Sequence, residues 1–259
     1  MASRKIGLAL GGGAARGFAH IGVLKVLAEN NIPIDLIAGT SVGSVVGGAL
    51  AAGMTPDQIA DLGRGVAWWK LSRPPFSPRG ILSNSGLGEL ISRQFPVTRF
   101  EDLKIPFGAV ACDIETGEEV VLKTQGDLAP AIRASCAIPG VFTPVDIDGR
   151  TLVDGGVVAP IPSRAVREMG ADLVIAVDVI ACGSVNWGKP TTLLGVIFQS
   201  VMMMLRAASM NQHYDADIVI IPQISHIRPD ELGRMDDLVK AGEEAARERI
   251  DEIKALVNK

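Results

Sequence analysis

The stretch IDLIAGTSVGSVVGGALAAG, residues 34–53, passes from a short apolar run into a run of small residues, with Gly39-Thr40-Ser41-Val42-Gly43 at the junction. A G-x-S-x-G motif between a strand and a helix is the setting of a nucleophile elbow, a sharp turn that projects the serine Oγ outward. Gly39 and Gly43 relieve crowding at the turn, and the helix N-terminus favours developing negative charge. We therefore predict that Ser41 is a catalytic nucleophile; the alternative is a tight turn without chemical function.

Outward from this stretch, short apolar runs bounded by Gly, Pro or Asp alternate with longer runs of helical period, as is typical of an α/β fold in which helices cover a mostly parallel sheet. The predicted strands are Ile6–Leu10, Ile34–Ala38, Phe107–Ala111, Leu173–Val177 and Ile218–Ile221. The predicted helices are Ala15–Glu29, Val42–Ala52, Pro56–Arg64, Ser85–Phe95, Leu128–Ala134, Pro162–Met169, Leu193–Ser209 and Asp230–Leu256. Hairpin turns are predicted near Thr116-Gly117 and at Asp148-Gly149. A chain of 259 residues can form a single domain, 1–259.

The composition disfavours several classes of protein. A formal net charge of −4 leaves no basic footprint for nucleic acid, which is not expected as a partner. The uncharged stretch 36–56 is long enough to span a membrane, but its many glycines disfavour a lipid-facing helix. The basic start at residues 1–5 leads into an apolar run too short for a signal peptide. Cys112, Cys136 and Cys182 lack metal-type spacing, which indicates buried thiols without a disulfide in a reducing, cytoplasmic compartment.

A second glycine-rich turn, Gly11-Gly12-Gly13-Ala14-Ala15-Arg16-Gly17, follows the first predicted strand. Backbone N–H groups in such a turn can bind an anion. The dinucleotide pattern G-x-G-x-x-G fails here, because Arg16 takes the place of the third glycine, and a P-loop would need Gly-Lys-Ser/Thr. In a hydrolase the same amides suit an oxyanion hole. Arg16 is interpreted as a brace for this loop, a phosphate contact or a solvated first-turn residue.

The third segment whose residues could take part in catalysis is Val153-Asp154-Gly155-Gly156, at the end of the second predicted hairpin. The hairpin would deliver Asp154 to a defined edge, and the two glycines permit close backbone approach. A carboxylate there could act as a base, although the usual base for a serine nucleophile is histidine. Of the three histidines, His20, His213 and His226, the last would satisfy the chain order Ser, Asp, His of an α/β-hydrolase. The residues alone leave both kinds of base open.

Four segments in this order resemble the patatin-like phospholipase family, especially its single-domain bacterial members, which are similar to the catalytic domain of neuropathy target esterase. These segments are 11–24, 39–43, 133–142 and 154–156. The resemblance implies a three-layer α/β/α fold, a dyad of Ser41 and Asp154 without histidine, and an acyl-enzyme intermediate. It implies a lipid or other ester as substrate, with no cofactor and no metal. The implied oxyanion hole consists of Gly12, Gly13 and Ala14. The residues expected to support the site as a whole are Arg16, Gly39, Gly43, Gly155 and Gly156.

Two positions depart from the family pattern. Ala14 stands where a further glycine is common, so a positive φ there would cost free energy. Ala159 stands where many relatives have asparagine, which affects the surroundings of the dyad and not the dyad itself.

Two other functions stay open at this point. An acyl-carrier acyltransferase would also use a serine elbow but would need a histidine base, and a non-catalytic lipid-sensing protein would keep the fold as a binding pocket. The segment Arg64–Pro96 is interpreted as a lid or as a surface excursion packed on its own aromatics, and Trp68-Trp69 within it favour peripheral membrane contact. The helix Leu193–Ser209 is apolar on more than one face, and burial in the core is favoured over a dimer or membrane contact. The oligomeric state is left open.

Overall fold

A mixed sheet of eight strands forms the centre of the computed structural model, which describes residues 4–74, 77–182 and 188–258. The strands are β1 (Ile6–Leu10), β2 (Leu36–Thr40), β3 (Phe107–Asp113), β4 (Glu119–Lys123), β5 (Val145–Ile147), β6 (Arg150–Asp154), β7 (Leu173–Val177) and β8 (Ile218–Ile220). Their order is β5-β6-β3-β2-β1-β7-β8, and β4 also pairs with β3. The pairings among β3, β2, β1, β7 and β8 are parallel, whereas β3–β4, β3–β6 and β5–β6 are antiparallel. The predicted α/β fold with a mostly parallel sheet is confirmed.

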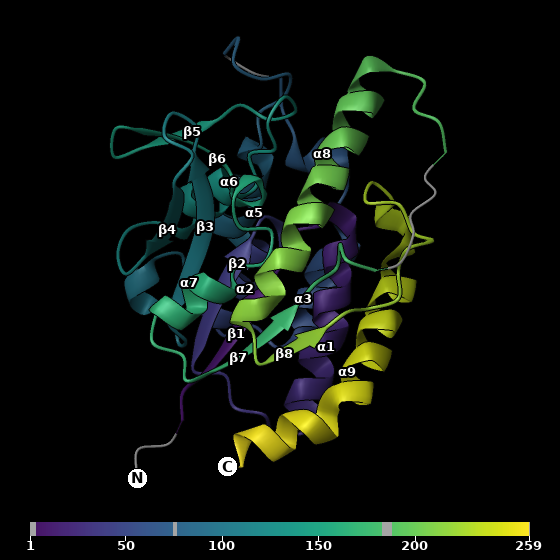
Figure 1. Cartoon of the computed structure of the whole chain (residues 1–259). Helices are drawn as coiled ribbons and strands as arrows, with labels where there is room; N and C mark the ends of the chain where they lie inside the picture. The colour runs from purple at the N-terminus through teal and green to yellow at the C-terminus, as the bar shows by residue number, and fades with distance from the viewer. Residues whose placement is uncertain (1–3, 75–76, 183–187, 259) are drawn as a thin grey trace.

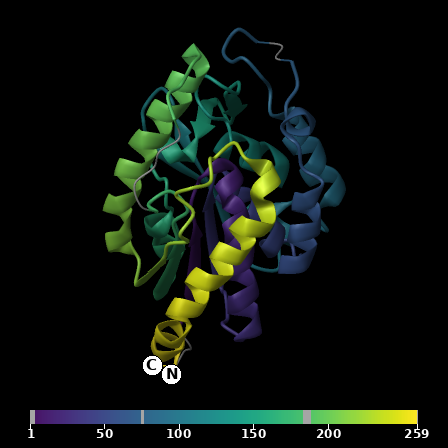
Figure 2. The same ribbon diagram turned by 90° about the vertical axis from the view of Figure 1, so that its right-hand side faces the viewer.

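Helices cover both faces of this sheet, as Figures 1 and 2 show. They are α1 (Phe18–Glu29), α2 (Val42–Ala51), α3 (Pro56–Arg64), α4 (Trp68–Leu71), α5 (Ser85–Gln94), α6 (Leu128–Ser135), α7 (Ser163–Glu168), α8 (Leu193–Asn211) and α9 (Met235–Val257). Alternate residues of a strand point to opposite faces, so Leu8 and Leu10 pack with α1 and α2 while Ala9 faces α7. The result is three layers.

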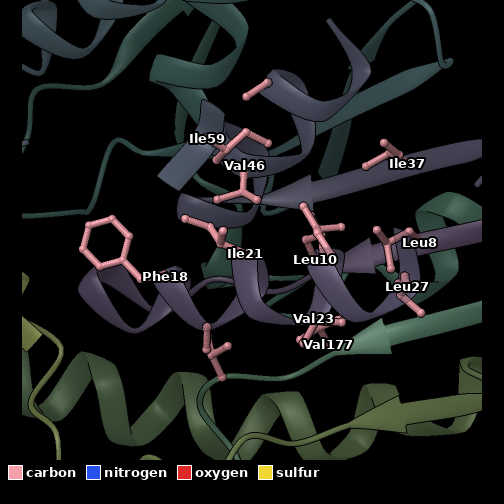
Figure 3. Close-up of a cluster of buried hydrophobic side chains, with 14 of the residues drawn as sticks. Leu8, Leu10, Phe18, Ile21, Val23, Leu27, Ile37, Val46, Ile59 and Val177 are labelled. Carbon is pink, nitrogen blue, oxygen red and sulfur yellow. The ribbon is translucent and has the colours of Figure 1, made fainter. Parts of the chain in front are cut away.

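The main hydrophobic core lies between the sheet and the pair of helices α1 and α9. Leu8, Leu10, Ile37 and Val177 enter it from three strands, and Ile21 enters it from α1 (Figure 3). All five are essentially inaccessible to solvent. The helices α1 and α9 lie side by side in Figure 2, and small residues permit this approach. A Cβ on Gly22 or on Gly242 would collide with the backbone of the other helix.

Both hairpins form where they are predicted. The turn between β5 and β6 has positive φ at Asp148 (49°) and Gly149 (76°), which is the conformation of a tight two-residue hairpin turn. Gly117 lies in the connection between β3 and β4. The strand predicted at Ile34–Ala38 instead runs from Leu36 to Thr40, and Asp35 before it accepts a hydrogen bond from the Ile6 amide through its carboxylate (2.8 Å) and donates its own amide to the Ile6 carbonyl (2.8 Å).

The expectation that the helix at residues 193–209 is buried in the core is wrong. Of the apolar side chains on α8, Leu193 is 76% exposed, Met203 62% and Met204 71%, whereas Met202 is buried. Figure 1 shows α8 lying in front of the sheet, and among its described side chains Met202 and Ser209 are the buried ones. Among the described residues, no helix is both long and apolar enough to cross a membrane.

Candidate active site

Ser41 is the single residue between β2 and α2, and its backbone is held at φ 53° and ψ −127°. A conformation of this kind costs a non-glycine residue roughly 1–3 kcal/mol and persists only where the surroundings hold it. The neighbouring glycines make the room: a Cβ on Gly39 would collide with the backbone of Gly43, and a Cβ on Gly43 would collide with the Leu10 carbonyl. The predicted strand–turn–helix therefore forms, with Ser41 at its apex.

The buried hydroxyl of Ser135, at the end of α6, holds this turn in place. Its Oγ accepts a hydrogen bond from the Ser41 amide (2.9 Å) and donates one to the Val110 carbonyl (2.6 Å). One side chain thereby satisfies a donor and an acceptor of the buried backbone. Sequence reasoning assigned no role to Ser135, although it lies in the quoted segment 133–142, because the contact with Ser41 crosses 94 positions of the chain.

Two further hydroxyls anchor the residues around the nucleophile. Thr40 Oγ1 donates to the Ala159 carbonyl (2.7 Å), and Ser44 Oγ donates to the Ser41 carbonyl (2.6 Å). The departure at Ala159 therefore leaves in place a backbone contact that does not depend on the side chain at that position.

Asp154 ends β6 and lies opposite Ala111 of β3. This pairing brings its carboxylate to the nucleophile: Ser41 Oγ donates to Asp154 Oδ2 at 2.6 Å, and the Gly156 amide donates to Oδ1 at 2.8 Å. A Cβ on Gly155 would collide with the Val110 carbonyl, so a glycine is required for the turn after Asp154 to pack against β3.

The environment makes this carboxylate a stronger base than an exposed aspartate. Asp154 is only 5% exposed, and burial raises the pKa of its carboxyl to about 6, while the hydrogen bonds from Ser41 and Gly156 act to lower it. Desolvation disfavours the charged form, which is why the proton is held more tightly than in water. At neutral pH the carboxyl is therefore mostly ionised. Its pKa also lies close to neutral pH, as suits a general base that must accept a proton.

The glycine-rich loop lies against Ser41, since a Cβ on Gly12 would come within 3.3 Å of the Ser41 Cβ. The Gly12 amide already donates to the Pro160 carbonyl (2.9 Å). In the described part of the chain, the amides of Gly13 and Ala14 have no hydrogen-bond acceptor. Of the three residues predicted to form an oxyanion hole, only Gly13 and Ala14 therefore have an amide available to bind an oxyanion, and the oxyanion hole stays a prediction. Ala14 adopts φ 51°, a conformation that costs alanine about 1 kcal/mol.

Arg16 ties the glycine-rich loop to the segment that precedes α9. Its side chain is fully buried, and the guanidinium donates to the carbonyls of Ile227 (2.8 Å) and Ser225 (3.3 Å). The interpretation of Arg16 as a solvated residue is therefore wrong, and its contacts are those of a brace.

None of the three histidines, all of which lie in described segments, hydrogen-bonds to Ser41. His20 is buried and donates from Nε2 to the Gly11 carbonyl (2.8 Å), and burial lowers the pKa of its ring to about 4. His213 Nε2 lies 2.8 Å from Asp178 Oδ2, and His226 is exposed. The geometry therefore offers an aspartate and no histidine as the base for Ser41.

Two cavities meet at Ser41. The larger, about 130 Å³, has almost entirely apolar walls from α1 to α5 and the loop 138–142. Trp68, Leu71 and Leu87 show that the segment 64–96 forms one of these walls. Cys136 also lines it and is half-buried, not buried as predicted.

The smaller cavity, about 30 Å³, reaches Asp154 from the other side of Ser41. Gly13 and Ala14 line it, and α8 covers it with Met202 and Leu205. The reacting atoms of a substrate placed at Ser41 would therefore lie between the apolar cavity and the free amides of the glycine-rich loop.

Comparisons with known proteins point to one family. The family model described as patatin-like phospholipase matches residues 8–167. An uncharacterized NTE family protein of Mycobacterium tuberculosis is 42% identical over 180 residues, which make up 68% of this chain and 49% of that protein. The patatin-like phospholipase domain-containing protein 7 of Rattus norvegicus is 37% identical over 187 residues, or 67% of this chain and 13% of that protein. The chain thus spans about half or less of the length of these relatives.

A solved structure supports the fold alone. VipD from Legionella pneumophila aligns with a TM-score of 0.60 at 15% identity, covering 96% of this chain and 67% of that one.

Proposed function

Since the chain belongs to the patatin-like phospholipase family, we propose that it hydrolyses carboxylic esters of lipids, with Ser41 as nucleophile and Asp154 as general base. Family membership supports a lipid hydrolase; the dyad and the ester-hydrolase class are our proposal. The observation that carries it is the 2.6 Å hydrogen bond from Ser41 Oγ to the buried Oδ2 of Asp154. We extend the proposal to residues 1–259 as one hydrolase domain; a cytoplasmic location stays a prediction.

The first half of the reaction forms an ester on the protein. Asp154 Oδ2 accepts the hydroxyl proton as Ser41 Oγ attacks the substrate carbonyl carbon. The carbonyl oxygen becomes an oxyanion, which the amides of Gly13 and Ala14 and the N-terminus of α2 stabilise. When the tetrahedral intermediate collapses, Asp154 returns the proton to the departing alkoxide oxygen. The acyl group then remains on Ser41 Oγ.

The second half regenerates the serine. Water takes the place of the leaving group and attacks the acyl carbon while Asp154 accepts one of its protons. The C–Oγ bond breaks, the proton passes to Ser41 Oγ, and the free carboxylic acid departs. In both half-reactions only Ser41 and Asp154 transfer protons, and the bonds formed and broken balance without a cofactor.

The apolar cavity favours an acyl chain as the part of the substrate that is bound. Its walls carry almost no polar surface, so they can replace water around a hydrocarbon chain but cannot satisfy a charged headgroup. The chain would lie in this cavity with its carboxyl carbon at Ser41, and the leaving group would face the opening. The same arrangement suits a phospholipid, a lysophospholipid or a simpler ester.

The acyltransferase alternative has no comparable support, because His213 is engaged with Asp178 and His226 is exposed, so neither histidine contacts Ser41. A non-catalytic lipid-binding protein would not need a strained serine bonded to a buried carboxylate.

Fluorophosphonate labelling tests the proposal directly, because the reagent reacts only with an activated serine. The wild-type chain should label and should hydrolyse a short p-nitrophenyl ester. Ser41→Ala should lose both activities and Asp154→Asn nearly all of both, with circular dichroism unchanged, whereas His213→Ala and His226→Ala should retain them. Full labelling of Ser41→Ala, or loss of labelling in His226→Ala, would overturn the assignment.

A further inference from the structure

We propose that the protein docks on anionic lipid bilayers through one surface that surrounds the opening of the active site. We call this the entrance surface: residues 62–74 and 77–88 together with 188–214, which contains α8. The proposal concerns binding and does not depend on the chemistry at Ser41.

The exposed apolar side chains of the protein are concentrated on this surface. Among the described residues, the large apolar side chains that are exposed lie on it or beside it, apart from Ile114 on the β3–β4 connection. They are Trp68, Trp69, Ile81, Leu193, Val196, Ile197, Met203, Met204, Met210 and Tyr214, with Val157 next to α8. Scattered single exposed apolar side chains are normal, but their concentration on one part of the surface marks a site of contact.

The two parts of the surface are connected through shared neighbours. The loop 138–142 touches both, because the Leu82 amide donates to the Val141 carbonyl (2.9 Å) and Ile197 lies close to Gly140. Residue Asp230 also joins them, since its carbonyl accepts from Trp68 Nε1 (3.0 Å) and it lines a groove with residues 189–199. In Figures 1 and 2 the loop around residues 77–82 and the N-terminal end of α8 project at the end of the molecule opposite the chain termini, and α8 runs from there back towards the middle of the molecule.

The charge of this surface has the sign that an anionic bilayer requires. No Asp or Glu occurs from residue 62 to 88 or from 179 to 214, while these stretches hold six Lys and Arg residues in a chain of net charge −4. Within the described chain, Lys70, Lys189 and Arg206 have no carboxylate partner. Of the acidic side chains beside this surface, Asp146 is paired with Arg79 and Asp230 with Arg228, and Asp215 follows the surface in the chain, at the end of residues 212–215.

These features together favour a lipid surface over a second copy of the chain. In a twofold dimer the same patch meets itself, which would bring unpaired cations against like charges. A bilayer instead offers acyl chains to the methionines, an interfacial layer that tryptophan prefers, and anionic headgroups to the lysines. Both cavities that reach Ser41 are lined by this surface, through Trp68 on one side and Met202 on the other.

Vesicle flotation of the 259-residue chain carrying Ser41→Ala tests the proposal without lipid turnover. The protein should float with phosphatidylcholine vesicles that contain phosphatidylglycerol, and less with phosphatidylcholine alone or at high salt. Met203→Ser/Met204→Ser should lower the partition coefficient by about tenfold or more, because two exposed apolar side chains are lost. Ile114→Ser, which removes an exposed apolar side chain elsewhere, should leave it unchanged.

Charge reversal provides the second arm. Lys70→Glu/Lys189→Glu should weaken binding to phosphatidylglycerol vesicles by about tenfold or more and leave binding to phosphatidylcholine little changed. Lys123→Glu, at the exposed end of strand β4, is the control away from this surface. Absence of flotation, equal binding by the methionine variant, or a stable dimer in sedimentation that the methionine variant dissociates would overturn the proposal. Fluorophosphonate labelling of the wild-type chain reports on the proposed hydrolase independently.

Discussion

Replacing Asp154 by asparagine should stabilise the fold while it abolishes activity. Asparagine keeps the size of the side chain and can still accept from the Gly156 amide, but it carries no charge. The pKa of the buried Asp154 is raised from 3.8 to about 6. At about 1.4 kcal/mol per pKa unit, ionising this group in the folded protein costs about 3 kcal/mol relative to the unfolded chain.

The pH dependence of this effect follows from which state binds the proton more tightly. The folded chain holds the Asp154 proton up to about pH 6, whereas the unfolded chain releases it near its ordinary value, 3.8. The contribution of this group to stability is therefore fully present below 3.8 and is lost as the pH rises through about 6. The asparagine variant has no such loss, so its advantage should approach about 3 kcal/mol at about pH 8 and vanish near about pH 4.

Urea unfolding followed by circular dichroism measures this difference at both pH values. Asp57→Asn is the control with the opposite sign, because the hydrogen bond from Lys25 lowers the pKa of the Asp57 carboxyl. Removing the Asp57 carboxylate should reduce the free energy of unfolding at neutral pH. It should have no such effect below the pKa of Asp57 in the folded chain. If wild type and Asp154→Asn differed in stability by the same amount at both pH values, the pKa of Asp154 would not be raised in the folded chain.

Three further predictions concern activity, the elbow and the cavity. The kcat/KM for a p-nitrophenyl ester, measured against pH, should rise with an apparent pKa of about 6, because only ionised Asp154 can accept the serine proton; a flat profile down to about pH 4 would exclude Asp154 as the base. Gly43→Ala should lose about 3 kcal/mol or more in urea unfolding, since its Cβ would collide with backbone at Leu10. Gly48→Ala in the same helix, where the nearest atom is a side-chain terminus 2.9 Å away, should stay within about 1 kcal/mol of wild type; equal losses would contradict the argument from close approach. Ala49→Leu, which fills part of the apolar cavity, should lower kcat/KM for octanoate esters about tenfold and spare acetate esters, and a uniform fall across chain lengths would place the acyl chain elsewhere.

Local chemistry made the elbow and the hairpins predictable from sequence. The glycines at 39 and 43 and the Asp148-Gly149 turn act through contacts or dihedral angles within a few residues, so their signal is present in the sequence itself. The strands β1 and β7 were predictable for the same reason, because a fully buried parallel strand is apolar throughout. The error at β2 arose because Ile34 is apolar but precedes the residue, Asp35, that caps the neighbouring strand.

The composition of the active site depended instead on contacts between distant segments. The choice between aspartate and histidine as base was open in the sequence and turns on one distance, from Ser41 Oγ to Asp154 Oδ2, across 113 positions. The same holds for Ser135, which meets Ser41 only because α6 packs beside β3, and for Gly12, whose amide is taken by Pro160. No local pattern encodes these pairings, since they are set by how the sheet and helices pack.

The exposure of helix α8 could not be predicted from the sequence for a similar reason. Its apolar composition was visible in the sequence, but an apolar helix is buried only if another element covers it, and which face is covered is decided by tertiary packing. The sequence by itself therefore determined the elbow, the glycine-rich loop and the kind of fold, because these rest on residue size and local backbone conformation. Only the tertiary structure decided which base faces Ser41, which amides are free and which face of α8 is exposed, because burial and long-range hydrogen bonds exist only once the chain has packed.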